Sequence, residues 1–202
     1  MSLFKGQSEL ELTEGSILRP LFYLSLPIVI TNLLQVAYNI ADTFWLAGIP
    51  GEAGTDAVAG ITFAFPIVFL LISMGMGLSV AGSVLVAQHT GADEDDRASF
   101  AASQTVTWAL LGSAALGLLG FPLVGPLIEF LGASPSVLPG ARAYMQVIAL
   151  GLPFMFGFFV FIALMRGSGD TITPMVVMFG TVVLNIALDP FLIYGWTLIE
   201  NE

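Results

Sequence analysis

Two aspartates lie inside long apolar stretches of this 202-residue chain, where a carboxylate has few physical uses. Asp42 lies in "NIADTFWLAG" and Asp189 in "LNIALDPFLIYG". A charge at the bilayer centre costs about 2.5–3.5 kcal/mol on insertion scales, so such residues usually face a bundle interior and act on ions or substrates. The alternative is an acid at the membrane interface, because each aspartate lies only a few residues before a glycine, Gly48 or Gly195.

The first aspartate belongs to a polar stripe. Gln35, Tyr38 and Asp42 follow one another at steps of three and four, which places them on one face of a helix. One face of this helix would then carry an amide, a phenol and a carboxylate. Pro27 lies earlier in the same run and removes an intrahelical hydrogen bond, so it is a candidate hinge, with a static kink as the alternative.

The second aspartate ends a similar stripe. Asn185 and Asp189 are four residues apart, and Met178 lies two turns before Asn185 on the same face, where we expect it to line the pocket. Pro190 frees the carbonyl of Ile186 from its helical partner, which places a further acceptor beside the carboxylate. If the two helices are neighbours, the two stripes form one polar pocket.

The elements that must position these stripes are membrane helices. Hydrophobic residues make up 56% of the chain and charged residues 10%, against roughly 25% charged in a soluble domain. A spanning helix needs about 20 apolar residues, and five runs are long enough. They are residues 17–49, 58–88, 97–131, 139–165 and 172–198. The predicted fold is all-α, a polytopic transmembrane bundle of five spanning helices.

The basic residues predict the orientation of this bundle. Four of the five fall on the same side of the predicted membrane: Lys5, Arg19, Arg97 and Arg166. Because basic residues favour the cytoplasmic side of short loops, residues 1–15 are predicted to be a cytoplasmic segment of a multi-pass plasma-membrane protein. Arg142 alone falls on the external side, where the chain ends at Glu202.

Several other classes of function find no support in the sequence. The net charge of −10 argues against nucleic acid as a partner, and the acid-rich loops suit a cytoplasm rich in salt. The chain has no cysteine and no cluster of catalytic or metal-ligating residues, so we expect neither an enzyme nor a cofactor. His89, the one histidine, is expected to be an ordinary surface residue.

Four motifs resemble those of the N-terminal half of a multidrug and toxic compound extrusion (MATE) transporter, in family order and spacing. They are "LSLPIVITNLLQVAYNIADTFWLAG", "VAQHTGADEDDRA", "LMRGSGDTITPM" and "LNIALDPFLIYG". The resemblance implies a twelve-helix protein of two lobes, of which residues 16–199 form part of the first. The sixth helix and the second lobe are therefore expected as a missing remainder of the same transporter.

The resemblance also implies a function, which is export of cationic or amphiphilic small molecules driven by an H⁺ or Na⁺ gradient. It implies a cation site at Asp42, Asn185 and Asp189, with Tyr38 and Gln35 nearby and helix bending about Pro27. We therefore expect Tyr38 to lie close to the bound cation, and Gln35, Tyr38 and Met178 to line the substrate pocket. Two carboxylates in a dry pocket favour one shared proton, and we favour H⁺. Na⁺ bound by Asp42, Asn185 and Asp189 is the alternative. Two rival functions are a lipid or glycan flippase of the wider superfamily and a non-transporting membrane scaffold.

The orientation generates a testable prediction. The basic residues place the loop "TGADEDDR" in the cytoplasm, so Glu94→Cys should not react with an impermeant thiol reagent added to intact cells. It should react once the cells are permeabilised, and the absence of native cysteine in this chain makes the label specific. Reaction at Glu94→Cys in intact cells would reverse the predicted orientation.

Overall fold

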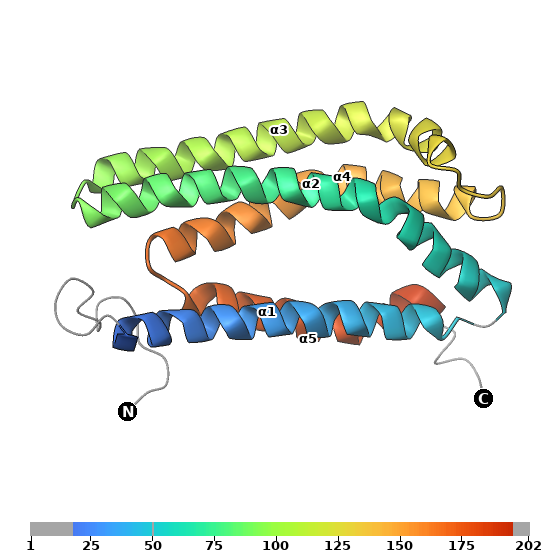
Figure 1. The fold of residues 1–202 in the computed structure, drawn as a ribbon, viewed down its shortest axis with the longest axis horizontal. Helices are drawn as coiled ribbons and strands as arrows, with labels where there is room; N and C mark the ends of the chain where they lie inside the picture. Colours follow the sequence, from blue (N-terminus) through green and yellow to red (C-terminus); the bar gives the residue numbers. More distant parts are fainter. Residues whose placement is uncertain (1–17, 50, 196–202) are drawn as a thin grey trace. The chain divides into compact units, whose positions relative to one another are not determined.

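The described part of the chain is helical. The computed structural model describes residues 18–49 and 51–195, and these residues contain no strand. The predicted N-terminal segment 1–15 and the predicted end of the fifth run at residue 198 lie outside the described residues. Five long helices contain most of the described residues, and Figure 1 shows them coloured in chain order.

The five helices are long and apolar enough to cross a membrane, as the sequence predicts. Their bounds are α1 Leu18–Ala47, α2 Glu52–Gly91, α3 Asp95–Phe130, α4 Leu138–Gly167 and α5 Ile172–Tyr194. With 40 residues, α2 is about 60 Å long at 1.5 Å per residue, twice the roughly 30 Å hydrocarbon core. This helix must therefore tilt or extend into the headgroup region and the water beyond it.

The helices form two compact units. The first contains α1 and α5, which lie side by side although three helices separate them in the chain (Figure 1). Both helices run in the same direction, because a contact joins Trp45 to Tyr194 near the carboxyl ends of both. Parallel neighbours require an intervening chain long enough to return to the starting side, and α2–α4 supply it.

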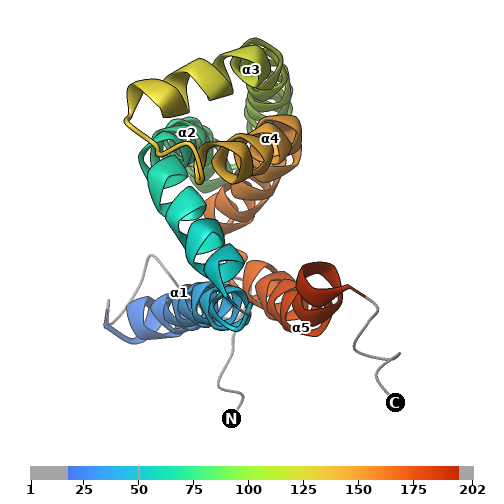
Figure 2. The ribbon, with the colours of Figure 1, turned by 90° about the vertical axis from the view of Figure 1, so that its right-hand side faces the viewer.

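The second unit contains α2, α3 and α4, and each of these helices packs against the other two (Figure 2). Two apolar clusters hold it together. One centres on Ile128 and Met145, and the other on Leu152 and Phe156, all at most 3% exposed. Small residues bring the backbones close, since a Cβ on Gly117 would collide with the carbonyl oxygen of Ala149.

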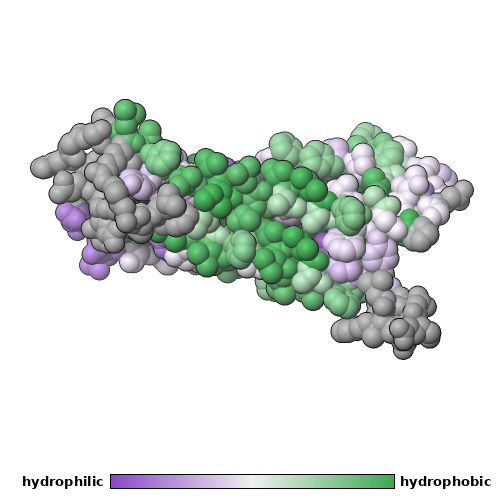
Figure 3. All heavy atoms as spheres, turned by 90° about the horizontal axis from the view of Figure 1, so that it is seen from below, coloured by the Kyte–Doolittle hydropathy of each residue, from purple (hydrophilic) through white to green (hydrophobic). Residues whose placement is uncertain are grey.

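Large apolar side chains cover much of the outer surface. Phe154, Leu118 and Leu192 are each more than 75% exposed, a pattern expected where the surrounding solvent is lipid. Figure 3 shows strongly apolar residues across the middle of one face and more hydrophilic residues towards its ends. The described chain is therefore built to lie in a bilayer.

Candidate functional site

The contact between α1 and α5 has a polar character that distinguishes it from the apolar clusters of α2–α4. The buried residues of α5 lie on one face: Pro174, Met178, Val182 and Asp189. On α1, Pro27 and Thr31 are buried. Because α1 is the helix that packs against α5, the buried faces of both helices form the contact between them.

Asp189 is the most deeply buried acid on this face. It is only 8% exposed, and Asn185 Nδ2 donates a hydrogen bond of 2.9 Å to its Oδ1. The other carboxylate oxygen, Oδ2, is buried without a hydrogen-bond partner in the described structure, and so is Asn185 Oδ1. The site therefore presents two buried oxygen atoms whose acceptor capacity is unused.

Asp42 reaches the same place from α1. Its side chain is half-buried, and its carboxyl lies close enough to Asp189 for the two groups to interact electrostatically. The parallel arrangement of α1 and α5 produces this meeting, because it brings the last turns of the two helices to the same level. The two carboxylates that the sequence places in separate apolar runs are thus brought together.

The other residues predicted for the site are less closely grouped. Tyr38 is half-buried on α1, one turn before Asp42. Met178 is 4% exposed on α5, and Thr181 donates to its backbone carbonyl. Gln35 is exposed and lies outside the buried contact between α1 and α5. Its place in a substrate pocket stays a prediction.

Pro27 interrupts the hydrogen bonding of α1 without ending the helix. It is buried, and α1 continues through it to Ala47. The hydroxyl of Thr31 donates a hydrogen bond of 2.8 Å to the carbonyl of Pro27. A hydroxyl bonded to the carbonyl four residues earlier bends helices slightly, so this stretch combines two causes of bending.

A pair of aromatic residues closes the far end of the contact. Tyr194 donates a hydrogen bond of 2.6 Å from its hydroxyl to the backbone carbonyl of Trp45. The two rings also meet edge to face, with centroids 6.3 Å apart. Sequence reasoning missed this pair, because only the neighbouring position of α1 and α5 reveals it.

The start of α5 is fixed by a capping carboxylate. Asp170 Oδ1 accepts hydrogen bonds from the backbone N–H groups of Ile172, at 3.0 Å, and Thr173, at 2.9 Å. Partial burial by itself would raise the pKa of Asp170, but the hydrogen bonds from Thr173 and Ile172 outweigh it and lower the pKa below its ordinary value. This cap secures the first turn of the helix that carries Asn185 and Asp189.

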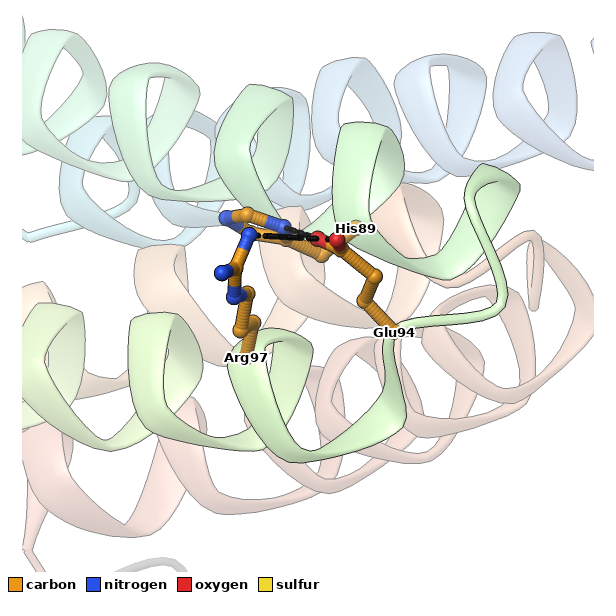
Figure 4. Close-up of polar contacts among 3 residues, drawn as sticks. All are labelled: His89, Glu94 and Arg97. Carbon is orange, nitrogen blue, oxygen red and sulfur yellow. Dashed lines mark hydrogen bonds and ion pairs between the residues drawn. The ribbon is translucent and has the colours of Figure 1, made fainter.

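A separate polar cluster joins α2 to α3 (Figure 4). His89 Nδ1 lies 2.8 Å from Glu94 Oε2, and Arg97 Nη1 donates to both oxygens of Glu94 at 3.1 and 3.2 Å. Glu94 is thus shared by the end of one helix and the start of the next. The histidine is a partner in a turn-closing network, which is a structural role.

The chemistry that the α1–α5 site can perform follows from its oxygen atoms. The described residues contain no group of three His, Cys, Asp or Glu side chains suited to hold a metal ion. The site offers two carboxylates and one amide oxygen, which are ligands for a proton or a hard monovalent cation. It has no nucleophile paired with a base.

Five helices long and apolar enough to cross a membrane, with two acids meeting between the first and the fifth, define a multi-pass membrane protein. The MatE family model matches residues 27–191, so the chain belongs to the MATE family of transporters. The match includes α5 almost to its end and therefore covers both halves of the site.

Individual relatives agree with this assignment. The probable multidrug resistance protein YoeA of Bacillus subtilis is 29% identical over 183 residues, which cover 91% of this chain and 39% of the relative. A FAD transporter of Shewanella oneidensis is 29% identical, covering 88% of this chain and 38% of its own length. A crystal structure of MATE in complex with MaD3S superposes with a TM-score of 0.84 at 27% identity, covering 96% of this chain and 42% of that one. The chain thus spans about 40% of the length of the relatives that it matches.

The Asp170 cap yields a prediction with a defined pH dependence. At pH 7, Asp170→Ala should lower stability by about 1 kcal/mol, because two N–H groups of α5 lose their acceptor. A carboxyl whose pKa is lowered by folding stabilises the folded state above its ordinary pKa of about 3.9, and this contribution is lost as the pH falls through the lowered value.

The measurement is thermal unfolding in detergent across a pH series. The difference between wild type and Asp170→Ala should be full at neutral pH and shrink in strong acid. Asp96→Ala, which removes an exposed acid from the first turn of α3, is the matched control and should have a smaller effect. Equal melting temperatures of wild type and Asp170→Ala at pH 7 would refute the capping role.

Proposed function

We propose that this chain forms part of a secondary active antiporter that exports cationic or amphiphilic compounds across the plasma membrane in exchange for H⁺ or Na⁺. Membership of the MATE family supports transport of small molecules. The observation that carries the ion coupling is the α1–α5 carboxylate pair, with one buried oxygen of Asp189 left without a partner. In this proposal the amino terminus is cytoplasmic.

The physical argument starts from the cost of placing two negative charges together in a membrane. Each isolated charge costs about 2.5–3.5 kcal/mol at the bilayer centre, and mutual repulsion adds to that cost. A single cation shared by Asp42 and Asp189 removes one net charge and satisfies the bare oxygen. The pair therefore has a physical reason to take up one cation and to release it when the surroundings become polar.

Exchange of the exported compound for the coupling ion follows if the protein cannot bind both at the same time. A cationic compound near the doubly ionised pair is stabilised by it, whereas an inward-moving H⁺ or Na⁺ neutralises one carboxylate and weakens that attraction. The bending allowed at Pro27 would convert this local change of charge into a change in the shape of α1. The coupling ion and the compound then occupy the protein in alternation.

Within this proposal we favour H⁺. The carboxyl of Asp42 and that of Asp189 lie close together, and Asn185 donates to Asp189, so one proton can be held between the two acids with the remaining charge stabilised by the amide. Na⁺ would need further oxygen ligands. Asn185 Oδ1 is one such atom, and a carbonyl freed by Pro190 would be another.

The charge of the first unit argues against an anionic cargo. A protein that moves an anionic lipid, or an anion such as the FAD for which the Shewanella relative is named, needs cationic side chains along the route of its cargo. In the sequence, α5 has no basic residue, and α1 has only Arg19 in its first turn. A non-transporting scaffold would have no use for two acids that meet between its helices.

The carboxylates give the first test of this function. In the full-length transporter, Asp42→Asn and Asp189→Asn should each abolish gradient-driven efflux, because neither variant retains two acids to share a cation. Expression should persist, since a neutral side chain costs less to insert. The double variant should be little worse than either single one, because residues that act as one unit are not additive.

Efflux and membrane abundance would be measured together in cells. Asp56→Asn, which alters a half-buried acid of α2 outside the site, is the control and should transport normally. Full efflux by either Asp42→Asn or Asp189→Asn would remove that residue from the mechanism.

The coupling ion gives the second test. Proteoliposomes holding the full-length transporter should show efflux when an inward H⁺ gradient is imposed in Na⁺-free buffer, because a proton needs only the two carboxyls. An inward Na⁺ gradient at equal pH should give little efflux. The reverse result would replace H⁺ by Na⁺ while leaving the carboxylate pair in place.

A further inference from the structure

The aromatic contact at the end of α1 and α5 is more specific than packing requires. The Tyr194 hydroxyl bonds the Trp45 carbonyl at 2.6 Å, and the rings of the two residues meet at 76°. The bond joins residues 149 positions apart in the chain. It therefore fixes one helix against another, which a local helix-capping bond cannot do.

The acceptor suits this purpose because it lies in the last turn of α1. The final carbonyls of a helix lack the usual partner four residues ahead. The carbonyl of Trp45 accepts one bond of 3.2 Å from the backbone of Gly48, and the second lone pair is used by Tyr194. The hydroxyl thus completes the hydrogen bonding at the end of α1 and ties that end to α5.

Gly48 provides the space that the hydroxyl needs. A Cβ at this position would overlap the Tyr194 hydroxyl oxygen, whereas the ring carbon that bears it would be at an ordinary contact distance of 3.6 Å. The severe clash is thus with the hydroxyl oxygen, whereas the carbonyl oxygen of Trp45, at 3.3 Å, is a tight contact that a small shift can relieve. Gly48 and the hydroxyl of Tyr194 are sterically complementary.

The contact of Tyr194 with Trp45 beside Gly48, called the clamp below, lies close to the two carboxylates along both helices. Trp45 follows Asp42 by three residues in α1, and Tyr194 follows Asp189 by five in α5. Both intervening segments are helical, and Pro190 in the second removes only the hydrogen bond to the carbonyl of Ile186, which precedes Asp189. Fixing Tyr194 against Trp45 consequently limits how far Asp42 can move from Asp189.

We propose that Tyr194 is a positioning residue for the ion site, and that its hydroxyl bond to Trp45 in the space left by Gly48 holds Asp42 against Asp189. This inference rests on the proposed function, because it assigns a role in ion coupling. When the bond is absent, the two carboxyls spend more time apart and share a cation less effectively. The clamp itself touches neither the ion nor the transported compound.

The first variant removes one oxygen atom. Tyr194→Phe keeps the edge-to-face ring contact and loses the hydrogen bond. One intramolecular hydrogen bond is worth enough to change an equilibrium about three- to tenfold, so the ion concentration for half-maximal efflux should rise by about that factor. The maximal rate should change much less, and thermal stability should stay close to that of wild type.

The second pair of variants tests the steric complementarity. Gly48→Ala should raise the half-maximal ion concentration as Tyr194→Phe does, because the new methyl group displaces the hydroxyl. Adding Gly48→Ala to Tyr194→Phe should then cause little further loss, since the phenyl ring leaves room for the methyl group and the carbonyl of Trp45 needs only a small shift. Such a cycle separates loss of this contact from a general loss of packing.

Helix spacing gives a readout that does not depend on transport. Spin labels at Ile40→Cys and Leu192→Cys, both exposed, would report the distance between α1 and α5 by pulsed electron resonance in a cysteine-free full-length background. Tyr194→Phe should broaden the distance distribution. Tyr23→Phe, at the other end of α1, and Gly180→Ala, which has nothing within 4 Å of its Cβ, are matched controls and should change neither readout.

The outcomes separate this inference from the function on which it rests. An unchanged distance distribution in Tyr194→Phe would overturn the clamp. A broadened distribution with unchanged ion dependence would overturn the positioning role. Normal efflux by Asp42→Asn and Asp189→Asn would instead reject the proposed coupling site, whatever the spin labels show.

Discussion

The arrangement of α1 and α5 depends on how a carboxylate is stabilised inside a membrane. Asp189 is buried in α5, and neither lipid nor apolar side chains can stabilise its charge. Asn185 on the same helix satisfies one oxygen, and Asp42 approaches from α1. The pairing of α1 with α5 is therefore what gives the two acids a shared environment, and the parallel direction of these helices is what makes their levels coincide.

The two units of the chain use different means of holding helices together. In α2–α4, interlocking apolar side chains and close glycine contacts act over long stretches, and the polar cluster of His89, Glu94 and Arg97 lies at one turn. Between α1 and α5, hydrogen bonds and a carboxylate pair replace part of that packing. Contacts of the second kind are more sensitive to charge, which is what the proposed binding and release of an ion requires.

Local sequence patterns were sufficient for the helices and insufficient for their pairing. Run length and hydropathy predict all five spans, and the steps between Asn185 and Asp189 predict their shared face. The Tyr194–Trp45 contact could not be predicted, because it depends on which helices are neighbours and on their relative register. Gln35 shows the same limit of local patterns. Its spacing places it on one helical face with Asp42, but it lies outside the buried face of α1 because the position of α5 decides which residues are covered.

The sequence separation of the α1–α5 contact also matters while the protein is being made. The ribosome adds about 5–20 residues per second, so the 149 residues between Trp45 and Tyr194 take roughly 7–30 s to synthesise. During that interval α1 has entered the membrane while its partner helix does not yet exist. Asp42 must then be accommodated without Asp189, with only α1 and those of α2–α4 that have already been made. Biogenesis thus passes through a stage in which the first half of the proposed ion site has no second half.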